Sequence, residues 1–242
     1  SLLLLTIDTL RADRIGAYGY EGARTPALDR LAKEGALFER AIAQSSWTRP
    51  SFGTLFTSRY PTEHQAAWRL LKNAPGDRHS LYNRPLRTDL PTLAALLDAG
   101  GYLTIGVNTN VQTSRPFGFD HGFDHFIDVS RPMSVLTSSM ACHAPWLGTS
   151  KLCGRWSAVS PDYPYLTGDR VLEIFRAIAT RLERSPRPFF LWLHFMDPHV
   201  PYRAHDGSGA KMGYDDIERL LAGDGGAARA ARETSTMYDA AV

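Results

Sequence analysis

The amino-acid sequence predicts an α/β fold with a mainly parallel central sheet. Strand-like and helix-like segments alternate along the chain, with lengths that suit crossover connections between parallel strands. The first segment, Leu2–Ile7, is a continuous apolar run, which is typical of a strand covered on both faces. With 242 residues, 43% of them apolar, the chain can build a substantial core in one large domain or two small ones.

The elements of the first half follow in order. Leu2–Ile7 is the first strand, and Asp8 comes directly after it, at the expected carboxyl edge of the sheet. Thr25–Gly35 predicts a helix, because a threonine cap and a proline open it and a glycine closes it. A short strand is expected at Leu37–Gln44. The next helix is expected to begin near Pro50, since proline suits the first turn of a helix.

The second half continues the alternation of strands and helices. The sequence predicts a helix at Leu90–Gly101, a strand at Tyr102–Asn108, a helix at Asp169–Leu182 and a strand at Phe189–Phe195. Weaker helical patterns lie at Tyr214–Leu221 and from Gly226 onward.

Residues 113–165 interrupt this pattern with proline, glycine, serine and aromatic residues. A stretch of this length predicts an insertion or a functional lid. It contains both cysteines, Cys142 and Cys153, which can form one disulfide or remain thiols and which fit no zinc spacing. The chain begins inside a strand pattern and stops inside a helical one, so we expect it to be part of a longer domain whose C-terminal part is missing.

The overall charge gives little reason to expect a charged partner. The formal net charge is only +2, which argues against nucleic acid as a ligand. No apolar run reaches the roughly 18 residues that a membrane-spanning helix needs, so no membrane segment is expected. The cellular compartment stays open.

Polar residues with reactive side chains follow two apolar strands and precede one helix. Asp8 follows the first strand, Asp197 and His199 follow Phe189–Phe195, and Thr48 stands before a helix. In an open α/β sheet, ligands bind outside the carboxyl ends of the strands, so we expect these residues to converge. A carboxylate beside a hydroxyl favours a divalent cation, which would activate a weak nucleophile.

Each of these residues also has a plain structural interpretation. Thr48 belongs to a residue type that commonly caps helices. Asp8 and Asp197 suit the turns after their strands, and His199 lies in a loop between two prolines. His194, inside an apolar strand, is interpreted as a core residue. Only the joint occurrence of the candidates favours a catalytic site.

Five segments of the chain resemble, in order, the sulfatase branch of the alkaline phosphatase superfamily. They are LLLLTIDTLRADRIGAYGY, TPALDRLAKEGALFERAIAQ, SWTRPSFGTLFTSRYP, LAALLDAGGYLTIGVNTN with FGFDHGFDHF, and PFFLWLHFMDPHVPY, and they cover most of residues 1–204. The resemblance implies a three-layer α/β/α sandwich, with residues 1–242 as the N-terminal portion of a single catalytic domain. It also implies cleavage of sulfate or phosphate esters at a metal-bound nucleophile.

The resemblance gives each candidate residue a role. Asp8 matches the metal-binding aspartate after the first strand, and Thr48 falls at the position of the nucleophile, which also binds the metal. His199 matches the histidine that contacts the substrate's anionic group or its leaving oxygen. Asn110, or alternatively Asn108, lies where the family places further polar contacts. The remaining metal ligands are expected beyond the end of the chain.

The sequence also departs from the family pattern. The family motif Cys-x-Pro-x-Arg, whose cysteine matures to formylglycine, is here represented by Thr48, Pro50 and Phe52, and threonine cannot become formylglycine. Arg49 either reaches inward or lies on the surface. Thr9 replaces the second acidic residue of the usual pair. These departures resemble superfamily members that use a threonine directly, such as phosphotransferases and phosphodiesterases.

The leading hypothesis is a metal-dependent hydrolase that forms a covalent intermediate on Thr48. His199 would contact the anionic group or protonate the leaving group, and Asp197 would orient His199 or contact the substrate. The ion would be calcium, manganese, zinc or magnesium, and the substrate a small-molecule, saccharide or lipid ester of sulfate or phosphate. The alternatives are a phosphoryl transferase of the same superfamily, a non-catalytic binding module and, matching the segments less well, an isomerase similar to phosphoglycerate mutase. Many relatives are exported, and this sequence leaves localisation open.

Overall fold

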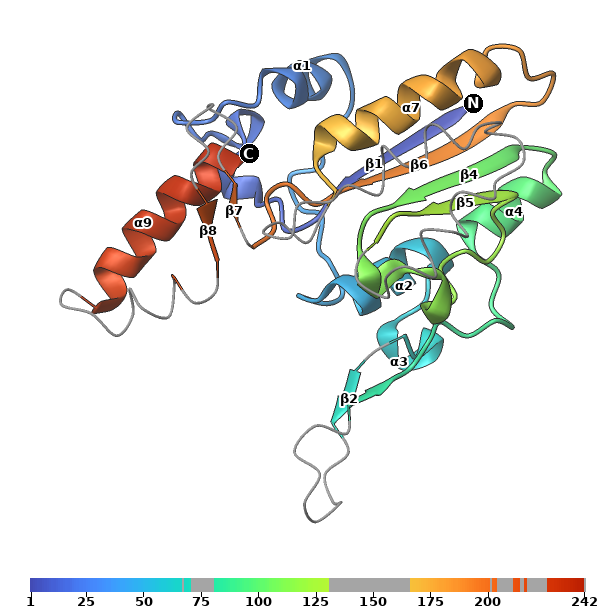
Figure 1. The fold of residues 1–242 in the computed structure, drawn as a ribbon, viewed down its shortest axis with the longest axis horizontal. Coiled ribbons are helices and arrows are strands. Elements are labelled where there is room, and N and C mark those ends of the chain that lie inside the picture. The colour runs from blue at the N-terminus through green and yellow to red at the C-terminus, as the bar shows by residue number, and fades with distance from the viewer. Residues whose placement is uncertain are drawn as a thin grey trace. The chain divides into compact units, whose positions relative to one another are not determined.

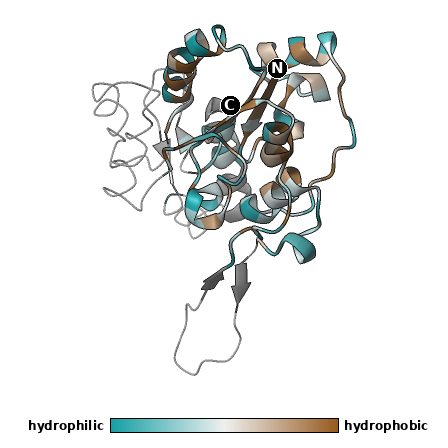
Figure 2. Ribbon diagram, turned by 90° about the vertical axis from the view of Figure 1, so that its right-hand side faces the viewer, coloured by the Kyte–Doolittle hydropathy of each residue, from teal (hydrophilic) through white to brown (hydrophobic). Residues whose placement is uncertain are grey.

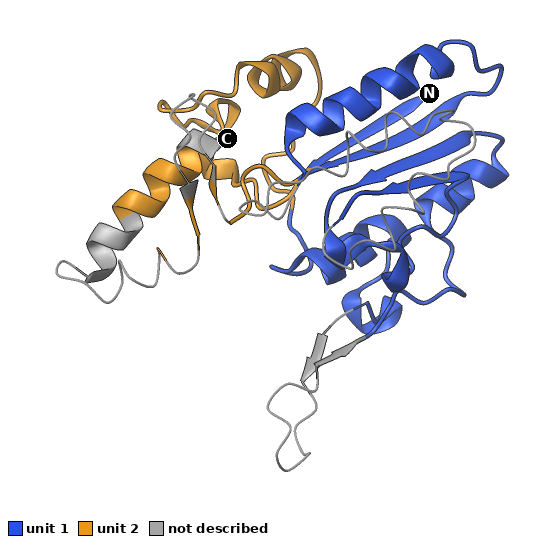
Figure 3. Ribbon diagram, viewed as in Figure 1, with its two compact units in different colours: residues 1–6, 42–195 blue, residues 7–41, 196–242 orange. Residues whose placement is uncertain are grey.

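The computed structural model describes residues 1–66, 68–70, 81–130, 166–200, 202–203, 211–213, 216 and 226–241. The chain divides into two compact units, which Figure 3 colours separately. The first unit comprises residues 1–6 and 42–195, and the second comprises residues 7–41 and 196–242.

A four-stranded parallel sheet organises the first unit (Figure 1). Its strand order is β1 (Leu2–Ile7), β6 (Phe189–Phe195), β4 (Leu103–Asn108) and β5 (His125–Asp128). In the middle of the sheet, Val107 of β4 pairs with Leu193 of β6 on one side and with Ile127 of β5 on the other. Hydrophobic residues concentrate along these strands, and hydrophilic residues are frequent in the connecting loops (Figure 2).

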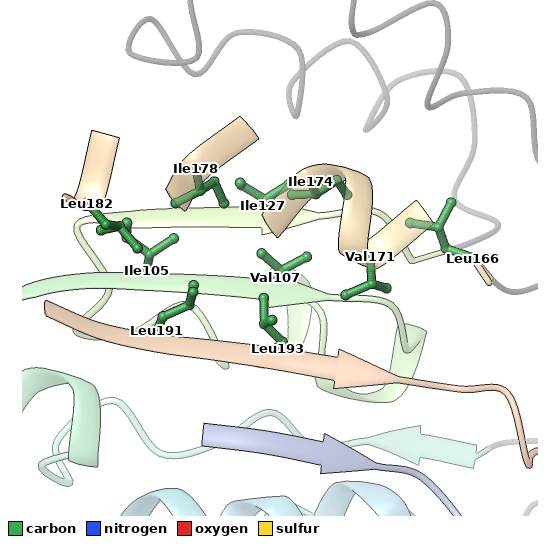
Figure 4. Packing of buried hydrophobic residues seen from close by; sticks show 10 residues of the cluster. All are labelled: Ile105, Val107, Ile127, Leu166, Val171, Ile174, Ile178, Leu182, Leu191 and Leu193. Carbon is green, nitrogen blue, oxygen red and sulfur yellow. The ribbon is translucent and has the colours of Figure 1, made fainter. Parts of the chain in front are cut away.

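Helix α7 (Gly168–Leu182) covers one face of the sheet (Figure 4). Val171, Ile174 and Ile178 are fully buried and recur at the three- and four-residue spacing of one helix face. They pack on alternate residues of the strands, because successive side chains of a strand point to opposite faces. The other buried members of this cluster are Ile105, Val107, Ile127, Leu166, Leu182, Leu191 and Leu193.

Helices α2 (Thr48–Thr57) and α4 (Leu93–Ala99) contribute to the hydrophobic cluster on the opposite face of the sheet. This second cluster is mainly aromatic, and its buried members are Phe52, Phe56, Ala94, Phe117, Phe119, Phe126, Phe190 and Trp192. Gly106 of β4 lies beneath the rings, where an added Cβ would come within 2.9 Å of Phe126. Helices on both faces of a parallel sheet confirm the predicted three-layer α/β/α architecture.

Shorter elements complete the first unit. Thr92 caps α4, accepting a hydrogen bond from the amide of Ala95 at 3.1 Å. Among the described residues of this unit, the remaining elements are the helix α3 (Pro61–His64), the 3₁₀ turns η3 (Val111–Thr113) and η4 (Arg115–Phe117), and an antiparallel hairpin of β2 (Trp68–Leu70) and β3 (Leu81–Asn83).

The second unit is held together around the C-terminal helix α9 (Gly226–Ala241). The hydroxyl of Tyr238 accepts a hydrogen bond from the amide of Arg11 and donates one to the carbonyl of Thr9, both at 2.8 Å. Asp239 forms an ion pair with Arg14 at 3.0 Å. The other elements that the structure describes in this unit are η1 (Ala12–Arg14), η2 (Gly16–Tyr18), α1 (Pro26–Glu34), β7 (Tyr202–Arg203) and β8 (Lys211–Met212).

One sequence-based prediction of secondary structure is corrected. Leu37–Gln44 was expected to be a strand, but it forms no strand in the structure, and Phe38 and Ile42 are 73% and 81% exposed. The expectation of an insertion or lid at residues 113–165 stays a prediction; the described part of this segment contributes η4 and β5. Residues 131–165, with both cysteines, lie outside the described residues, as does most of Tyr214–Leu221.

None of the helices in the described part of the chain combines the length and apolar character needed to cross a bilayer.

Candidate active site

Thr48 is the first residue of α2. The preceding residue, Trp47, is extended (φ −126°, ψ 140°) and occupies the N-cap position, where its side chain makes no capping hydrogen bond. The helix thus begins two residues before Pro50, and Thr48 is not its capping residue. Pro50 fits at the third position of the helix. Proline has no backbone N–H, and an N–H in the first turn would have no hydrogen-bond partner inside the helix. Thr48 is half-buried at the positive end of the helix dipole, an environment that stabilises an anion.

Arg49 points inward, although it is the second residue of the helix. It is 1% exposed, and its guanidinium donates hydrogen bonds to the backbone oxygen of Gln112 at 3.3 Å and to the Oε1 of Gln112 at 2.6 Å. The centre of the guanidinium lies 3.5 Å from the centroid of the Phe117 ring. Burial lowers the pKa of Arg49 to about 10, so the side chain is still cationic at neutral pH.

His64 supports the first turn of α2 from α3. Its ring is fully buried, and Nδ1 accepts a hydrogen bond from the amide of Ala66 at 3.1 Å. The hydrogen of the neutral ring therefore lies on Nε2, which is 3.1 Å from the carbonyl oxygen of Pro50 and 3.2 Å from the hydroxyl of Thr54. Burial lowers the pKa of His64, which favours this neutral form.

The two candidate asparagines after β4 have different roles. Asn108 is fully buried; its Nδ2 bonds to Asp128, and its Oδ1 accepts a hydrogen bond of 2.6 Å from Thr113. This arrangement makes Asn108 a structural residue that shapes the loop. Asn110 is 3% exposed and caps η3, its Oδ1 accepting the amide of Gln112 at 2.8 Å. The polar contact expected of Asn110, or alternatively of Asn108, stays a prediction.

Asp8 and Thr9 form the turn that follows β1. Asp8 is 7% exposed, so its carboxylate is almost entirely shielded from solvent. Thr9 has a positive φ of 57°, a conformation that is rare for a β-branched residue. Its hydroxyl donates to the carbonyl oxygen of Pro198 at 3.0 Å, and its own carbonyl accepts from Tyr238. The threonine at the position of the usual second acidic residue thus ties the Asp8 turn to the segment that carries Asp197 and His199.

Asp197 and His199 lie in the loop after β6. The amide of His199 donates to the carbonyl of Met196 at 2.9 Å, which closes a tight turn around Asp197. The Nδ1 of His199 lies 2.6 Å from the carbonyl oxygen of Val200. Since a carbonyl oxygen only accepts, Nδ1 carries the hydrogen, and the neutral ring presents Nε2 as its acceptor.

His194 is a core residue, as its sequence context indicated. It is fully buried in β6, its ring meets the Phe52 ring edge-on at 4.9 Å, and its Nδ1 lies 2.9 Å from the hydroxyl of Thr6.

The site residues are divided between the two units. Thr48 and Asn110 belong to the first unit, whereas Asp8, Asp197 and His199 belong to the second. Within the second unit, the hydrogen bond from Thr9 to Pro198 joins the segment of Asp8 to the segment of Asp197. The cation that would bridge Asp8 and Thr48 remains a prediction, because these two residues lie in different units.

The surroundings of Asp8 bear on whether it can hold a metal ion. A shielded carboxylate such as Asp8 suits a divalent cation, which prefers oxygen ligands and compensates the buried negative charge. Among the described residues, however, no three or more histidine, cysteine, aspartate or glutamate side chains gather as a metal site. Asp8 therefore fits a cation, and any complete coordination shell needs further ligands.

Sequence reasoning left the orientation of Arg49 open and did not identify Gln112 or the bond from Thr9. The only signal for Arg49 was its place next to Thr48 in the sequence. The contacts of both Arg49 and Thr9 reach residues far away in the chain, at positions 112, 117 and 198.

Comparison with known proteins gives a consistent family assignment. The sequence model of the family described as "Sulfatase" matches residues 1–219. Arylsulfatase A from Bos taurus is 29% identical over 238 residues, covering 86% of this chain and 44% of the relative. Iduronate 2-sulfatase from Mus musculus is 24% identical over 216 residues, covering 84% of this chain and 36% of the relative. The chain thus spans less than half the length of these two curated relatives.

A solved structure supports the fold. The crystal structure of a protein in the alkaline phosphatase superfamily from Vibrio parahaemolyticus matches with a TM-score of 0.55 and 19% identity. The match covers 100% of this chain and 48% of that protein. At this identity the likeness concerns the fold alone.

Proposed function

Because the chain belongs to the sulfatase family, we propose that it forms part of a hydrolase that cleaves sulfate esters, with Thr48 as the nucleophile. The observation that carries the proposal is the place of Thr48 as a half-buried hydroxyl at the first residue of α2. The helix dipole and the amides of the first turn favour negative charge at this point. An attacking alkoxide and the oxygens of a sulfuryl group both carry such charge.

Members of the sulfatase family generally use a divalent metal ion, and in this chain Asp8 and Thr48 would hold it. When bound, such an ion favours the ionised form of a coordinated hydroxyl. Calcium, manganese, zinc and magnesium all suit a site that includes a carboxylate and a hydroxyl oxygen.

The reaction proceeds in two steps. In the first, the Thr48 hydroxyl gives up its proton to solvent, and its Oγ1 forms a bond to the sulfur of the ester while the bond from sulfur to the leaving oxygen breaks. The leaving alcohol takes a proton from His199, whose protonated ring carries a hydrogen on Nε2. In the second step, water attacks the sulfur of the threonine ester and loses its two protons, one to the departing Oγ1 of Thr48 and one to His199, as sulfate is released. General acid catalysis of this kind contributes about 10²- to 10⁴-fold.

Asn110 and Asp197 have supporting roles in this proposal. Asn110 lies two residues after β4, at the start of η3, and would donate a hydrogen bond from its amide nitrogen to an oxygen of the sulfuryl group. Asp197 lies in the same tight turn as His199 and would orient the histidine or a polar group of the substrate. The substrates of sulfatase relatives include saccharide sulfates, so a small-molecule, saccharide or lipid sulfate is the proposed substrate class.

A second candidate function is the cleavage or transfer of a phosphoryl group. Two observations favour it: Thr48 replaces the cysteine that matures to formylglycine, and Thr9 replaces an acidic residue. A threonine alkoxide attacks phosphorus by the same in-line geometry, so one active site serves either ester.

The test uses the intact protein, its Thr48→Ala variant and a matched Thr236→Ala control. Thr236 is an exposed helical threonine of the second unit. Turnover of p-nitrophenyl sulfate and of p-nitrophenyl phosphate is measured with each candidate metal. Acid-quenched samples are digested, and the peptide containing Thr48 is examined by mass spectrometry at a resolution that separates sulfate from phosphate adducts.

We expect the intact protein and the Thr236→Ala variant to turn over one of the esters and to carry the adduct. The Thr48→Ala variant should fold but lose both activity and adduct. Retained turnover in that variant would reject Thr48 as the nucleophile. Absence of turnover in the intact protein with every ester and metal would favour the non-catalytic binding module.

A further inference from the structure

The guanidinium of Arg49 occupies an electrostatically unfavourable place. It is 1% exposed, and it belongs to the second residue of α2, close to the positive end of the helix dipole. A cation is disfavoured there by the dipole, and burial removes most of its hydration. A surface orientation would avoid the loss of hydration and let solvent screen the dipole, so specific contacts must compensate for the inward orientation.

Gln112 and Phe117, in the segment that follows β4, provide contacts of this kind. Nε of Arg49 donates to the backbone oxygen of Gln112 at 3.3 Å, and Nη2 donates to the side-chain oxygen of the same residue at 2.6 Å. The planar group also lies over the Phe117 ring, 3.5 Å from its centroid. A desolvated cation over an aromatic ring and two charge-assisted hydrogen bonds are strong interactions for this side chain. Together they fix the guanidinium in position and in orientation.

The contacts continue from Gln112 to the end of the sheet. The amide of Gln112 donates to the Oδ1 of Asn110 at 2.8 Å, and Asn108 anchors the loop through its bonds to Thr113 and Asp128. Each of these residues belongs to the first unit. An unbroken series of hydrogen bonds therefore joins the residue next to Thr48 to the asparagine proposed to contact the substrate.

We infer that Arg49 is a positioning residue, which holds the start of α2 against the loop after β4 and so sets the place of the Thr48 hydroxyl relative to Asn110. The inference rests on the proposed function, because it assigns Thr48 and Asn110 to one reaction. Arg49 acts through Gln112 and Phe117. The planar guanidinium of arginine is essential to this role. The single ammonium of lysine cannot make both hydrogen bonds to Gln112 and also stack on the Phe117 ring.

The expected effect falls on the chemical step. A misplacement of about 1 Å in a reacting group costs on the order of 10²-fold in rate. We therefore expect Arg49→Met to lower kcat by about 10- to 100-fold while KM changes by less than about threefold. Arg49→Lys should lower kcat to a similar degree, and Gln112→Leu should do so more weakly. Arg59→Met is the matched control, because Arg59 lies just beyond the other end of α2 and is 53% exposed.

The experiment measures two properties of the intact protein and of these variants. The first is steady-state turnover of whichever p-nitrophenyl ester the protein cleaves. The second is amide hydrogen exchange in residues 48–57 and 110–117, which needs no activity. Arg49→Met and Gln112→Leu should accelerate exchange in both segments, whereas Arg59→Met should accelerate it in neither. If Arg49→Met does not fold, the Gln112→Leu variant carries the same test.

Two results would overturn the inference. One is unchanged exchange and unchanged kcat in Arg49→Met or Gln112→Leu. The other is recovery of kcat by Arg49→Lys to at least about half of the original value, since a charge alone would then suffice. A third result separates this inference from the proposed function. If the intact protein cleaves no ester but the variants still exchange faster in both segments, the proposed function is rejected and the coupling of the two segments is established.

Discussion

The substitution Gly53→Ala tests the packing that supports the helix bearing Thr48. An added Cβ at position 53 would lie 2.5 Å from Cε1, 2.7 Å from Nδ1 and 2.9 Å from Nε2 of His64. All three distances are shorter than a normal van der Waals contact. The ring cannot move away without cost, because Ala66, Pro50 and Thr54 lie within hydrogen-bonding distance of its two nitrogens.

Three effects set the expected magnitude. Overpacking of a well-packed core costs about 1–3 kcal/mol. Weakening one hydrogen bond of His64 costs about 0.5–1.5 kcal/mol. Against these, alanine is a better helix former than glycine by about 0.8–1.0 kcal/mol. The two costs together exceed the gain in helix propensity, so we expect Gly53→Ala to lower the free energy of unfolding by about 0.5–4 kcal/mol.

The assay is urea unfolding of the intact protein. The control is Gly213→Ala, because the nearest heavy atom to an added Cβ there is Asp216 Oδ2 at 3.7 Å, an ordinary contact. The control should change stability by less than about 0.5 kcal/mol. In a His64→Ala background the clash disappears, so Gly53→Ala should there be neutral or stabilising. A Gly53→Ala variant that is as stable as the original protein, with His64 intact, would refute this account.

Two further predictions concern stability. Burial lowers the pKa of His64 and of His125, so the unfolded chain takes up protons at a higher pH than the folded protein does. The free energy of unfolding should therefore decline as the pH falls below about 6.5, the pKa of histidine in the unfolded chain, and it should decline less steeply in His64→Gln. Urea unfolding between about pH 7.5 and 5.5 measures this, and a free energy of unfolding that does not change with pH would contradict the prediction. Ile174→Ala, at a fully buried position under the sheet, should cost about 2–5 kcal/mol, whereas Leu172→Ala, at a position 38% exposed, should cost less than about 1 kcal/mol. Equal losses in the two variants would show that the α7 face is not packed as described.

Elements with strong local signals were predicted well. The strands Leu2–Ile7 and Phe189–Phe195 have the bounds that their apolar runs indicated. Helix α1 begins at Pro26, as its proline and the preceding threonine predicted. In each case the signal lies within the element itself, because apolar runs and helix-terminal residues act over a few neighbouring positions.

Elements that depend on a distant partner were predicted poorly. His125–Asp128 has only two buried apolar residues, Phe126 and Ile127, and it becomes a strand by pairing with β4. Leu37–Gln44 has a more apolar sequence, but it forms no strand in the described structure. Strand formation requires a partner for the backbone hydrogen bonds, and a short sequence does not specify that partner.

The sequence by itself determined the α/β class, the family and the identity of the candidate site residues, since these follow from local patterns and from motifs. The tertiary structure alone decided that Arg49 points inward, that Asn108 is structural, and that Thr9 ties the Asp8 turn to Pro198. The physical reason is that each of these outcomes depends on hydrogen bonds between residues separated along the chain. Such contacts form only once folding has brought the sheet and its loops together.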